Sequence, residues 1–363
     1  MSTRSRASST VSGSSVVMTL NDMKEEKITK THRRRRTNSI VVTAVEDVSS
    51  TTNNKTLKSK KTLENKNDVI EIVNWKQLDE WQQDNEYIFN GYVKETNSAI
   101  KCLKSIKLLH NETVNIWTHL VPSIVYLFLL LGFTDFFLDR KLVEILGSDH
   151  HLMDALDYIM VNLFLLGAFL CLFCSSCFHC FKQHSENAST LWSKADYMGI
   201  VILISTSIIS LLYYGFHEHL FLCKLFTIIT AIFGSTCCVF VLNDQFNDKG
   251  WKAVRASFFV CFAASGLVPI LTGFFMFGIE NSAKRVQLLY VLFEAIAYII
   301  GAIIYGFKIP ECFFKPGKFD YFFNSHQIFH VFCVAGSIFH LRAVIASFIY
   351  AKTGVHSNSL FIF

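Results

Sequence analysis

Residues 154–179 have the sequence DALDYIMVNLFLLGAFLCLFCSSCFH. The two acidic side chains, Asp154 and Asp157, lie at its start, and the apolar part that follows has the length, roughly 20 residues, that a helix needs to cross a bilayer. A helix is also the form in which a single segment satisfies all its backbone hydrogen bonds inside hydrocarbon. The stretch therefore predicts a transmembrane helix, and this helix ends in a polar side chain, His179.

Six further stretches have the same character, so the predicted fold class is an all-α integral membrane protein with a seven-helix bundle. The chain is 51% hydrophobic and 17% charged, which is too apolar for an ordinary soluble domain of this length. The predicted core covers residues 113–352, and its last span ends near Tyr350. The spans are predicted to begin near Ile116, Asp154, Tyr197, Leu220, Ala253, Val286 and His326.

The segments on either side of the core differ from it in composition. Residues 1–75 are rich in Ser, Thr, Lys, Arg and Asn, which predicts a disordered tail. Residues 76–112 mix polar and apolar side chains and are predicted to form a juxtamembrane segment. Within it, amphipathic helix is expected against the bilayer around Trp75–Trp81 and Ile100–Leu109. Residues 353–363 are predicted to form a short tail at the opposite surface.

The lysines and arginines beside the spans predict the orientation, because these residues are enriched on the cytoplasmic side of membrane proteins. One surface is expected to carry Lys101, Lys104, Lys107, Lys182, Lys194, Lys249, Lys252, Arg255, Lys308, Lys315 and Lys318, and the other Arg140, Lys141, Lys284, Arg285 and Lys352. This bias predicts a cytoplasmic N-terminus and an external C-terminus. A further basic run, Arg33–Arg36, is short and lies in the predicted tail, so no nucleic-acid partner is expected.

Four polar residues lie at the ends of predicted spans. His179 ends the second span, and Asp196 begins the third. His326 and His330 begin the seventh, four residues apart and therefore on one helical face. Because successive spans alternate in direction, all four side chains are expected at the same depth, near the cytoplasmic surface. Such groups are costly in a membrane, so they indicate a functional site.

Three histidines and one aspartate at the same depth predict a zinc site. Neutral imidazole is a good zinc ligand, a pair of histidines at i and i+4 is a familiar zinc half-site, and three protein ligands leave a position for a catalytic water. In this interpretation Asp196 holds and deprotonates the bound water. Ser175 lies one turn before His179, where its hydroxyl could reach that water or a substrate oxyanion.

Other histidines and cysteines have simpler explanations. A membrane histidine is commonly a hydrogen-bonded interfacial residue, and we interpret His119 and His340 as core or cavity-facing. The external groups Asp149–His151 and His217–His219 would bind a metal only adventitiously. One series of cysteines recurs every three residues without a second thiol pair elsewhere, and packing is its expected role. This series is Cys171, Cys174, Cys177 and Cys180.

Several motifs taken together are typical of one known family. They are Trp81–Tyr87 (WQQDNEY), Asn111–His119 (NETVNIWTH), Phe178–His179 followed by His184–Glu186, Lys194–Ile200 (KADYMGI), Ile309–Glu311 (IPE), Pro316–Asp320 (PGKFD) and Ser325–Val331 (SHQIFHV). By these motifs, over about residues 75–345, the chain resembles the progestin and adipoQ receptor family. The resemblance is to its adiponectin-receptor branch, which is related to haemolysin III.

The resemblance implies roles for the site residues. The ligands of a zinc ion would be His179, His326 and His330, with Asp196 contacting the zinc-bound water and Ser175 nearby. It also implies a link to ceramide hydrolysis and to lipid and fatty-acid homeostasis. The family is similar to the alkaline ceramidases, which use a comparable set of Ser, Asp and three His.

The expected function is therefore an adiponectin-receptor-like membrane receptor that hydrolyses ceramide or a related lipid amide, with Zn²⁺ as cofactor and membrane lipids (ceramide and fatty acid) as partners. The alternative is a non-catalytic receptor or sensor in which zinc is structural. A transporter is disfavoured because the spans lack the Gly/Pro breaks of transporter sites. The plasma membrane is the expected location, with internal membranes as the alternative. An extracellular ligand stays unidentified, and a homodimer is compatible with the sequence.

Overall fold

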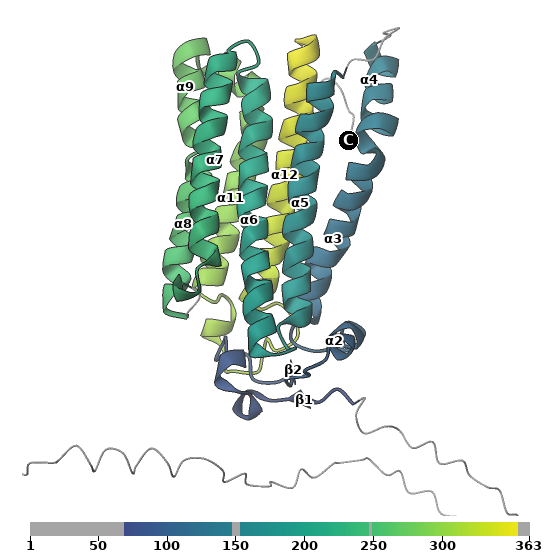
Figure 1. The fold of residues 1–363 in the computed structure, drawn as a ribbon, viewed down its shortest axis with the longest axis vertical. Helices are drawn as coiled ribbons and strands as arrows, with labels where there is room; N and C mark the ends of the chain where they lie inside the picture. Colours follow the sequence, from purple (N-terminus) through teal and green to yellow (C-terminus); the bar gives the residue numbers. More distant parts are fainter. Residues whose placement is uncertain (1–68, 147–152, 247–248, 355–363) are drawn as a thin grey trace, which may run out of the picture. The chain divides into compact units, whose positions relative to one another are not determined.

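The computed structural model describes residues 69–146, 153–246 and 249–354. Within them, seven helical segments are long and apolar enough to cross a membrane, which confirms the predicted seven-helix fold (Figure 1). The spans are α3 (Thr113–Gly132), α5 (Ala155–Phe181), α6 (Glu186–Gly215), α7 (Leu220–Leu242), α8 with α9 (Lys252–Ala264 and Leu267–Phe277), α11 (Leu288–Gly306) and α12 (Ser325–Thr353). Outside the described residues lie the predictions on residues 1–68 with Arg33–Arg36, on Asp149–His151 and on residues 355–363.

Shorter elements extend and connect the spans. The π-helical turn η4 (Phe133–Leu138) and α4 (Asp139–Leu146) continue α3, and α10 (Ile279–Arg285) lies between α9 and α11. The others are β1 (Ile72–Val73), η2 (Trp75–Gln77), η3 (Glu80–Gln82), β2 (Tyr92–Val93), α2 (Ala99–Ser105), η5 (Asp244–Phe246), η6 (Lys249–Trp251) and η7 (Glu311–Phe313).

Local sequence explains where spans begin and break. The Asp154 carboxylate accepts hydrogen bonds from the backbone N–H groups of Leu156 at 2.9 Å and Asp157 at 3.0 Å, and so caps the first turn of α5. The fifth span is divided into α8 and α9 near Pro269, which lies in the first turn of α9. Proline has no N–H to donate, and its ring clashes with the carbonyl four residues earlier, so the helix breaks just before it. The expectation that the spans lack Gly/Pro breaks is therefore wrong for the fifth span.

The seventh span lies inside the bundle, where α12 contacts α3, α5, α6 and α11. The neighbouring helices α5 and α6 pack closely because each of them has a glycine where it contacts the other. A Cβ added to Gly199 would lie 2.8 Å from the Cα of Cys171, and one added to Gly167 would lie 2.0 Å from Oγ1 of Thr206. Small residues let helix backbones approach in this way. The approach brings Asp196, one turn before Gly199, towards α5.

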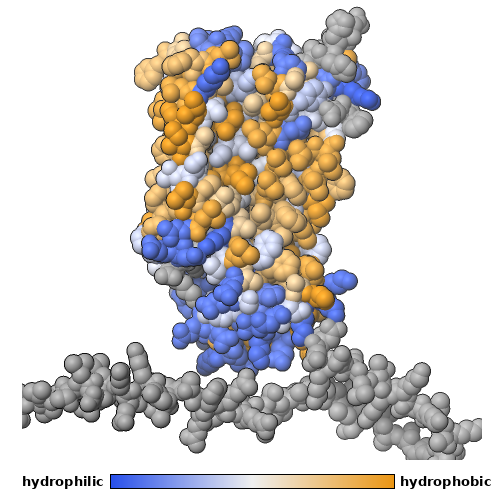
Figure 2. All heavy atoms as spheres, viewed as in Figure 1, coloured by the Kyte–Doolittle hydropathy of each residue, from blue (hydrophilic) through white to orange (hydrophobic). Residues whose placement is uncertain are grey.

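The outer faces of the spans are apolar. Figure 2 shows a broad hydrophobic band over the helices, with hydrophilic residues gathered where the chain from β1 to α2 meets the bundle. Large apolar side chains are exposed along this band, among them Phe128, Leu131, Ile232, Val239 and Phe275. In water such a surface would be unstable, whereas in a bilayer it faces lipid tails.

Residues 69–98, here called the N-terminal cap, close one end of the bundle, which we call the cap end. β1 pairs antiparallel with β2, and a small cluster of Leu78, Ile88 and Tyr92 forms the cap's own apolar core. The cap joins the turn after α5 through backbone hydrogen bonds, one of them from the Thr96 N–H to the carbonyl of Gln183 at 2.9 Å. The cap is therefore part of the folded unit and lies over the ends of the spans.

The helix α2 falls where amphipathic helix is predicted. It buries Cys102 and Ser105 and exposes Ile100 and Leu103. Two apolar side chains therefore face away from the protein beside the first span. That this face lies on the bilayer stays a prediction.

Candidate metal centre

Three histidines from two helices meet at the cap end of the bundle. His179 lies near the end of α5, while His326 and His330 lie in the first two turns of α12. Each offers a ring nitrogen, and these nitrogens all lie within 4.8 Å of one another. The ring centroids are separated by 4.7–4.8 Å, and the ring planes meet at 63–81°. The structure thus brings together the three histidines that the sequence selected.

The start of α12 is fixed by two acceptors. The side chain of Asn324 accepts from the Gln327 N–H at 3.1 Å, as an N-cap does. The buried carboxylate of Glu311 accepts from the Ser325 N–H at 2.8 Å and from the Ser325 hydroxyl. A carboxylate is favourable at a helix N-terminus, where the backbone N–H groups lack helical partners. These contacts define the turn that carries His326.

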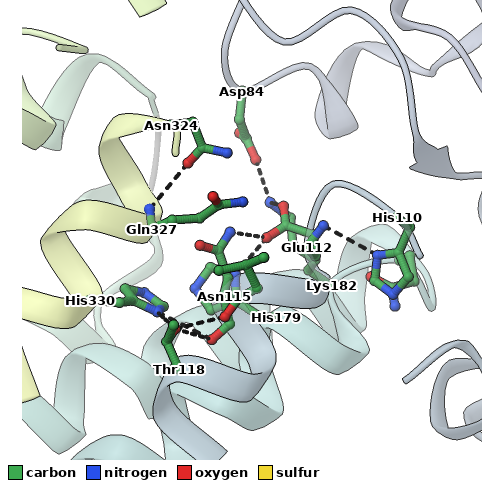
Figure 3. Close-up of polar contacts among 12 residues, drawn as sticks. Asp84, His110, Glu112, Asn115, Thr118, His179, Lys182, Asn324, Gln327 and His330 are labelled. Atoms are coloured by element: carbon green, nitrogen blue, oxygen red, sulfur yellow. Dashed lines mark hydrogen bonds and ion pairs between the residues drawn. The ribbon is translucent and has the colours of Figure 1, made fainter. Parts of the chain in front are cut away.

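Two of the rings are held through Nδ1 (Figure 3). Nδ1 of His179 lies 2.8 Å from Oε2 of Glu112. Nδ1 of His330 lies 3.2 Å from both the carbonyl oxygen of Asn115 and Oγ1 of Thr118. A histidine that binds a metal usually donates its other ring N–H to a carboxylate or carbonyl, which fixes the tautomer. With Nδ1 as donor, Nε2 of both rings carries the free lone pair.

Glu112 lies between the metal-ligand cluster and a basic side chain. Its Oε1 lies 2.9 Å from Nζ of Lys182, and its Oε2 accepts from the Asn115 side-chain amide at 2.6 Å. Burial alone would raise the pKa of Glu112. The Lys182 ammonium, the His179 ring and the Asn115 amide outweigh this effect and hold the pKa well below its ordinary value. Glu112 is therefore a carboxylate, and an acceptor for the His179 N–H.

No role at the metal centre was predicted from the sequence for Glu112, Asn115 or Lys182. The available signal was an acidic residue at the start of the first span, at the same predicted surface as the three histidines. That signal gives the depth of Glu112 in the membrane, but not the direction in which its side chain points. Only the structure shows that one carboxylate oxygen meets His179 and the other meets Lys182.

Asp196 and Ser175 lie beside this cluster. The Asp196 carboxyl interacts with the Ser175 hydroxyl and with the ring of His179. Ser175 is buried, and Asp196 is partly buried. The close packing at Gly199 accounts for this arrangement, because it presses the first turns of α6 against the last turns of α5. The structure thus gathers all five predicted site residues at one end of the bundle.

The remaining candidates lie elsewhere or play other parts. His119 stacks on His330, with ring centroids 3.6 Å apart and planes at 6°. Nδ1 of His340 instead lies 2.7 Å from Oε2 of Glu294 on α11. Among the described residues, the three-histidine cluster is the only group of three or more metal-binding side chains. His217 lies near Tyr214 and Glu218, where its Nδ1 is 3.0 Å from the Tyr214 carbonyl oxygen.

The cysteine series packs on different sides of α5. A spacing of three residues turns about 60° around a helix at each step, given 3.6 residues per turn, so the first and last members point in opposite directions. Accordingly, Cys171 belongs to the large apolar cluster that contains Phe164, whereas Cys180 packs with Cys102 and Ile116.

The three imidazoles fit a zinc ion. Nε2 of His179 is buried and has no hydrogen-bond partner among the described residues, although leaving such an atom unpaired costs free energy. A bound cation would satisfy this nitrogen, and three histidine nitrogens are a donor set that zinc prefers. Fold and site together define a seven-helix membrane protein with a buried three-histidine cluster that could hold a metal ion.

Comparison with known proteins agrees with this class. The haemolysin-III related family model matches residues 107–341, and the chain belongs to this family. It is 48% identical over 295 residues to the ADIPOR-like receptor IZH1 of Eremothecium gossypii, covering 81% of this chain and 90% of that protein. It is 42% identical over 279 residues to the ADIPOR-like receptor IZH2 of Saccharomyces cerevisiae, covering 76% and 84%.

A more distant relative is the adiponectin receptor protein of Drosophila melanogaster, which is 34% identical over 273 residues, with 75% of this chain and 59% of that protein covered. The predicted resemblance to adiponectin and adipoQ receptors is thereby confirmed. The protein is an integral membrane protein of this family.

Proposed function

We propose that His179, His326 and His330 hold a zinc ion, and that the protein is a receptor-like hydrolase of ceramide or a related lipid amide. The observation that carries this proposal is the arrangement of donors around one point. Three imidazoles converge, His179 presents a buried Nε2 without a partner among the described residues, and a fourth group, Asp196, lies beside them without belonging to the three-histidine group. Three ligands with a nearby carboxylate suit hydrolysis better than a closed structural site, which usually has four protein ligands.

The chain's own residues supply the remaining chemistry. When bound, zinc acts as a Lewis acid and lowers the pKa of water towards about 7. Asp196 accepts the proton of the attacking water at a carboxylate oxygen and passes it to the leaving nitrogen as the amide C–N bond breaks. Ser175 donates its hydroxyl proton in a hydrogen bond to the carbonyl oxygen as negative charge develops there. The products are a fatty acid and an amine.

Glu112 and Asn115 act on the rings rather than on the substrate. Glu112 holds the His179 N–H, and the Asn115 carbonyl holds the His330 N–H, so the two rings keep their orientation. Fixed ligands reduce the reorganisation that binding and reaction require.

We also propose that the cap end faces the cytoplasm, as the bias of lysine and arginine predicts. A lipid in the cytoplasmic leaflet would then keep its acyl chain among the apolar helices while its amide reaches the site. On this view the protein acts in lipid and fatty-acid homeostasis at the plasma membrane. Its ligand on the opposite side would be a molecule still to be identified.

A second candidate function is a receptor without catalysis. Because the three histidines come from α5 and α12, a bound ion would tie the cap ends of these helices together. A ligand or a change in the bilayer could then alter their packing.

The test is fatty-acid release from a defined ceramide by the purified protein in nanodiscs. Wild type is compared with Asp196→Ala and His330→Ala, and zinc content is measured for each. Hydrolysis is supported if wild type turns over, Asp196→Ala retains zinc but loses activity, and His330→Ala loses both. If zinc-loaded wild type releases no fatty acid from several lipid amides, catalysis is excluded and the ion is structural.

A further inference from the structure

A chain of four charged or titratable groups leads from the surface of the cap to the metal-ligand cluster (Figure 3). Oδ2 of Asp84 lies 3.0 Å from Nζ of Lys182, and Nζ lies 2.9 Å from Oε1 of Glu112. Oε2 of Glu112 lies 2.8 Å from Nδ1 of His179. The exposed side-chain fraction falls along this chain from 39% for Asp84 to 17%, 12% and 2%. This series of contacts thus connects the water-exposed surface of the cap to His179, a buried candidate metal ligand.

We propose that Asp84 and Lys182 are positioning residues for the metal centre, so that the N-terminal cap sets how tightly His179 holds its ion. The inference rests on the proposed zinc site. It assigns a role to residues that lie outside the three-histidine cluster, and Asp84 also lies outside residues 107–341, the range that the haemolysin-III related family model matches.

The two oxygens of Glu112 have different partners. One oxygen must face His179 for the carboxylate to hold the ring N–H. The ammonium of Lys182 binds the other oxygen and thereby fixes the rotation of the carboxylate. Without this cation, Glu112 would be a largely buried anion with one oxygen unpaired, and it would turn towards water. The direction of the His179 ring therefore depends on Lys182.

Lys182 in turn needs a second anion. Its ammonium sits on a flexible four-carbon stem, which does not fix its position by itself. Asp84 holds it from the side of the cap, opposite Glu112. Burial would lower the pKa of Lys182, but the two carboxylates raise it above its ordinary value, so the cation persists at neutral pH.

The cap is also joined to the rest of the protein by contacts that do not involve Asp84. The Asp320 carboxylate accepts the backbone N–H groups of Phe89 at 2.6 Å and Asn90 at 2.9 Å. Asn85 donates its side-chain amide to Glu311 at 3.1 Å. Removing the charge of Asp84 should therefore leave the cap docked, so that a change in metal binding reports on positioning rather than on unfolding.

The same loop offers a matched control. Oε2 of Glu86 lies 2.6 Å from Nζ of Lys308, in an ion pair that also joins the cap to the bundle. Its partner Lys308 is not among the four groups that lead from Asp84 to His179. An exposed ion pair usually contributes little to stability. If Asp84 were only a clasp of this kind, Asp84→Asn and Glu86→Gln would behave alike.

The experiment measures zinc affinity by chelator competition on the full chain in nanodiscs, together with the visible absorption spectrum of the Co²⁺-loaded protein. We expect Lys182→Met to weaken zinc binding about 10- to 100-fold, as loss of outer contacts to a metal ligand does. Asp84→Asn should weaken it by a smaller factor, and both should alter the Co²⁺ spectrum. Lys182→Arg should restore much of the affinity, and Glu86→Gln should match wild type.

The outcomes separate this inference from the proposed function. If the wild-type protein binds no zinc, both the positioning role and the proposed function are wrong. If wild type binds zinc but Lys182→Met and Asp84→Asn bind it equally well, only the positioning role is wrong. An equal loss in all variants, including Glu86→Gln, would instead show a general loosening of the cap and would also overturn the inference. Thermal unfolding of the metal-free variants shows whether each is folded.

Discussion

The bundle contains two carboxylate–imidazole pairs with almost the same local geometry. Glu112 and His179 meet at 2.8 Å at the cap end, and Glu294 and His340 meet at 2.7 Å between α11 and α12. In each pair Nδ1 faces the carboxylate, and Nε2 is buried without a hydrogen-bond partner among the described residues. Judged by the pair alone, either could be half of a metal site.

Their surroundings differ. The rings of His326 and His330 lie 4.8 Å from the ring of His179, whereas the ring closest to His340 in the described contacts is Phe164, at 4.6 Å. His340 belongs to no group of three metal-binding residues among those described. We conclude that a buried pair in a membrane indicates a metal site only where further ligands converge. The second pair joins two spans.

The largest effect is expected for His330→Ala. Removing one of three ligands should abolish stoichiometric zinc binding. This loss of zinc affinity is greater than the loss of up to about 100-fold that follows when a contact to a metal ligand is removed. The matched variant is His340→Phe, which removes a buried histidine from the same helix. It should keep its zinc. Metal analysis of the two purified proteins makes the comparison, and zinc retained by His330→Ala would contradict the three-ligand site.

A smaller but substantial effect is expected from breaking the second pair. Glu294→Leu leaves the buried Nδ1 of His340 without its partner, and the loss of a buried hydrogen bond to a charged group typically costs up to about 3 kcal/mol. The double variant Glu294→Leu with His340→Phe should recover part of this loss, because no unpaired polar group then remains. Thermal unfolding in nanodiscs tests the prediction. A double variant less stable than both single variants would show that the pair does more than join the helices.

The smallest effect is expected for Glu112→Gln. Glutamine keeps the shape of the side chain, but it is a weaker acceptor for the His179 N–H and a weaker partner for Lys182. We expect zinc affinity to fall about 10- to 100-fold, equivalent to about 1.4–2.7 kcal/mol. Glu294→Gln is the control and should leave zinc affinity unchanged. Equal effects of the two substitutions on zinc would remove the distinction between the pairs.

The fold could be predicted because length and apolarity alone define a span, and seven such stretches lie within the part of the chain that the structure describes. The shared depth of His179, His326 and His330 could also be predicted, since alternating spans place their ends at known depths, whereas the structure shows that their side chains meet. The pairing of Glu294 with His340 could not be predicted, because the depth of a residue in the membrane does not show on which side of its helix the side chain lies. The strands β1 and β2 are two residues each, too short to show an alternating pattern.

The acceptors at the start of α12 have a consequence for the kinetics of ion exchange. Two of the three histidines lie in the turns that Glu311 and Asn324 hold in place. Helix ends open first, and an opening of this turn would withdraw His326 and then His330 from the ion. Dissociation would then proceed at the rate at which one helical turn unwinds. The three imidazoles would then determine the equilibrium affinity for the ion. Glu311, which is not one of these ligands, would determine how long the ion stays bound.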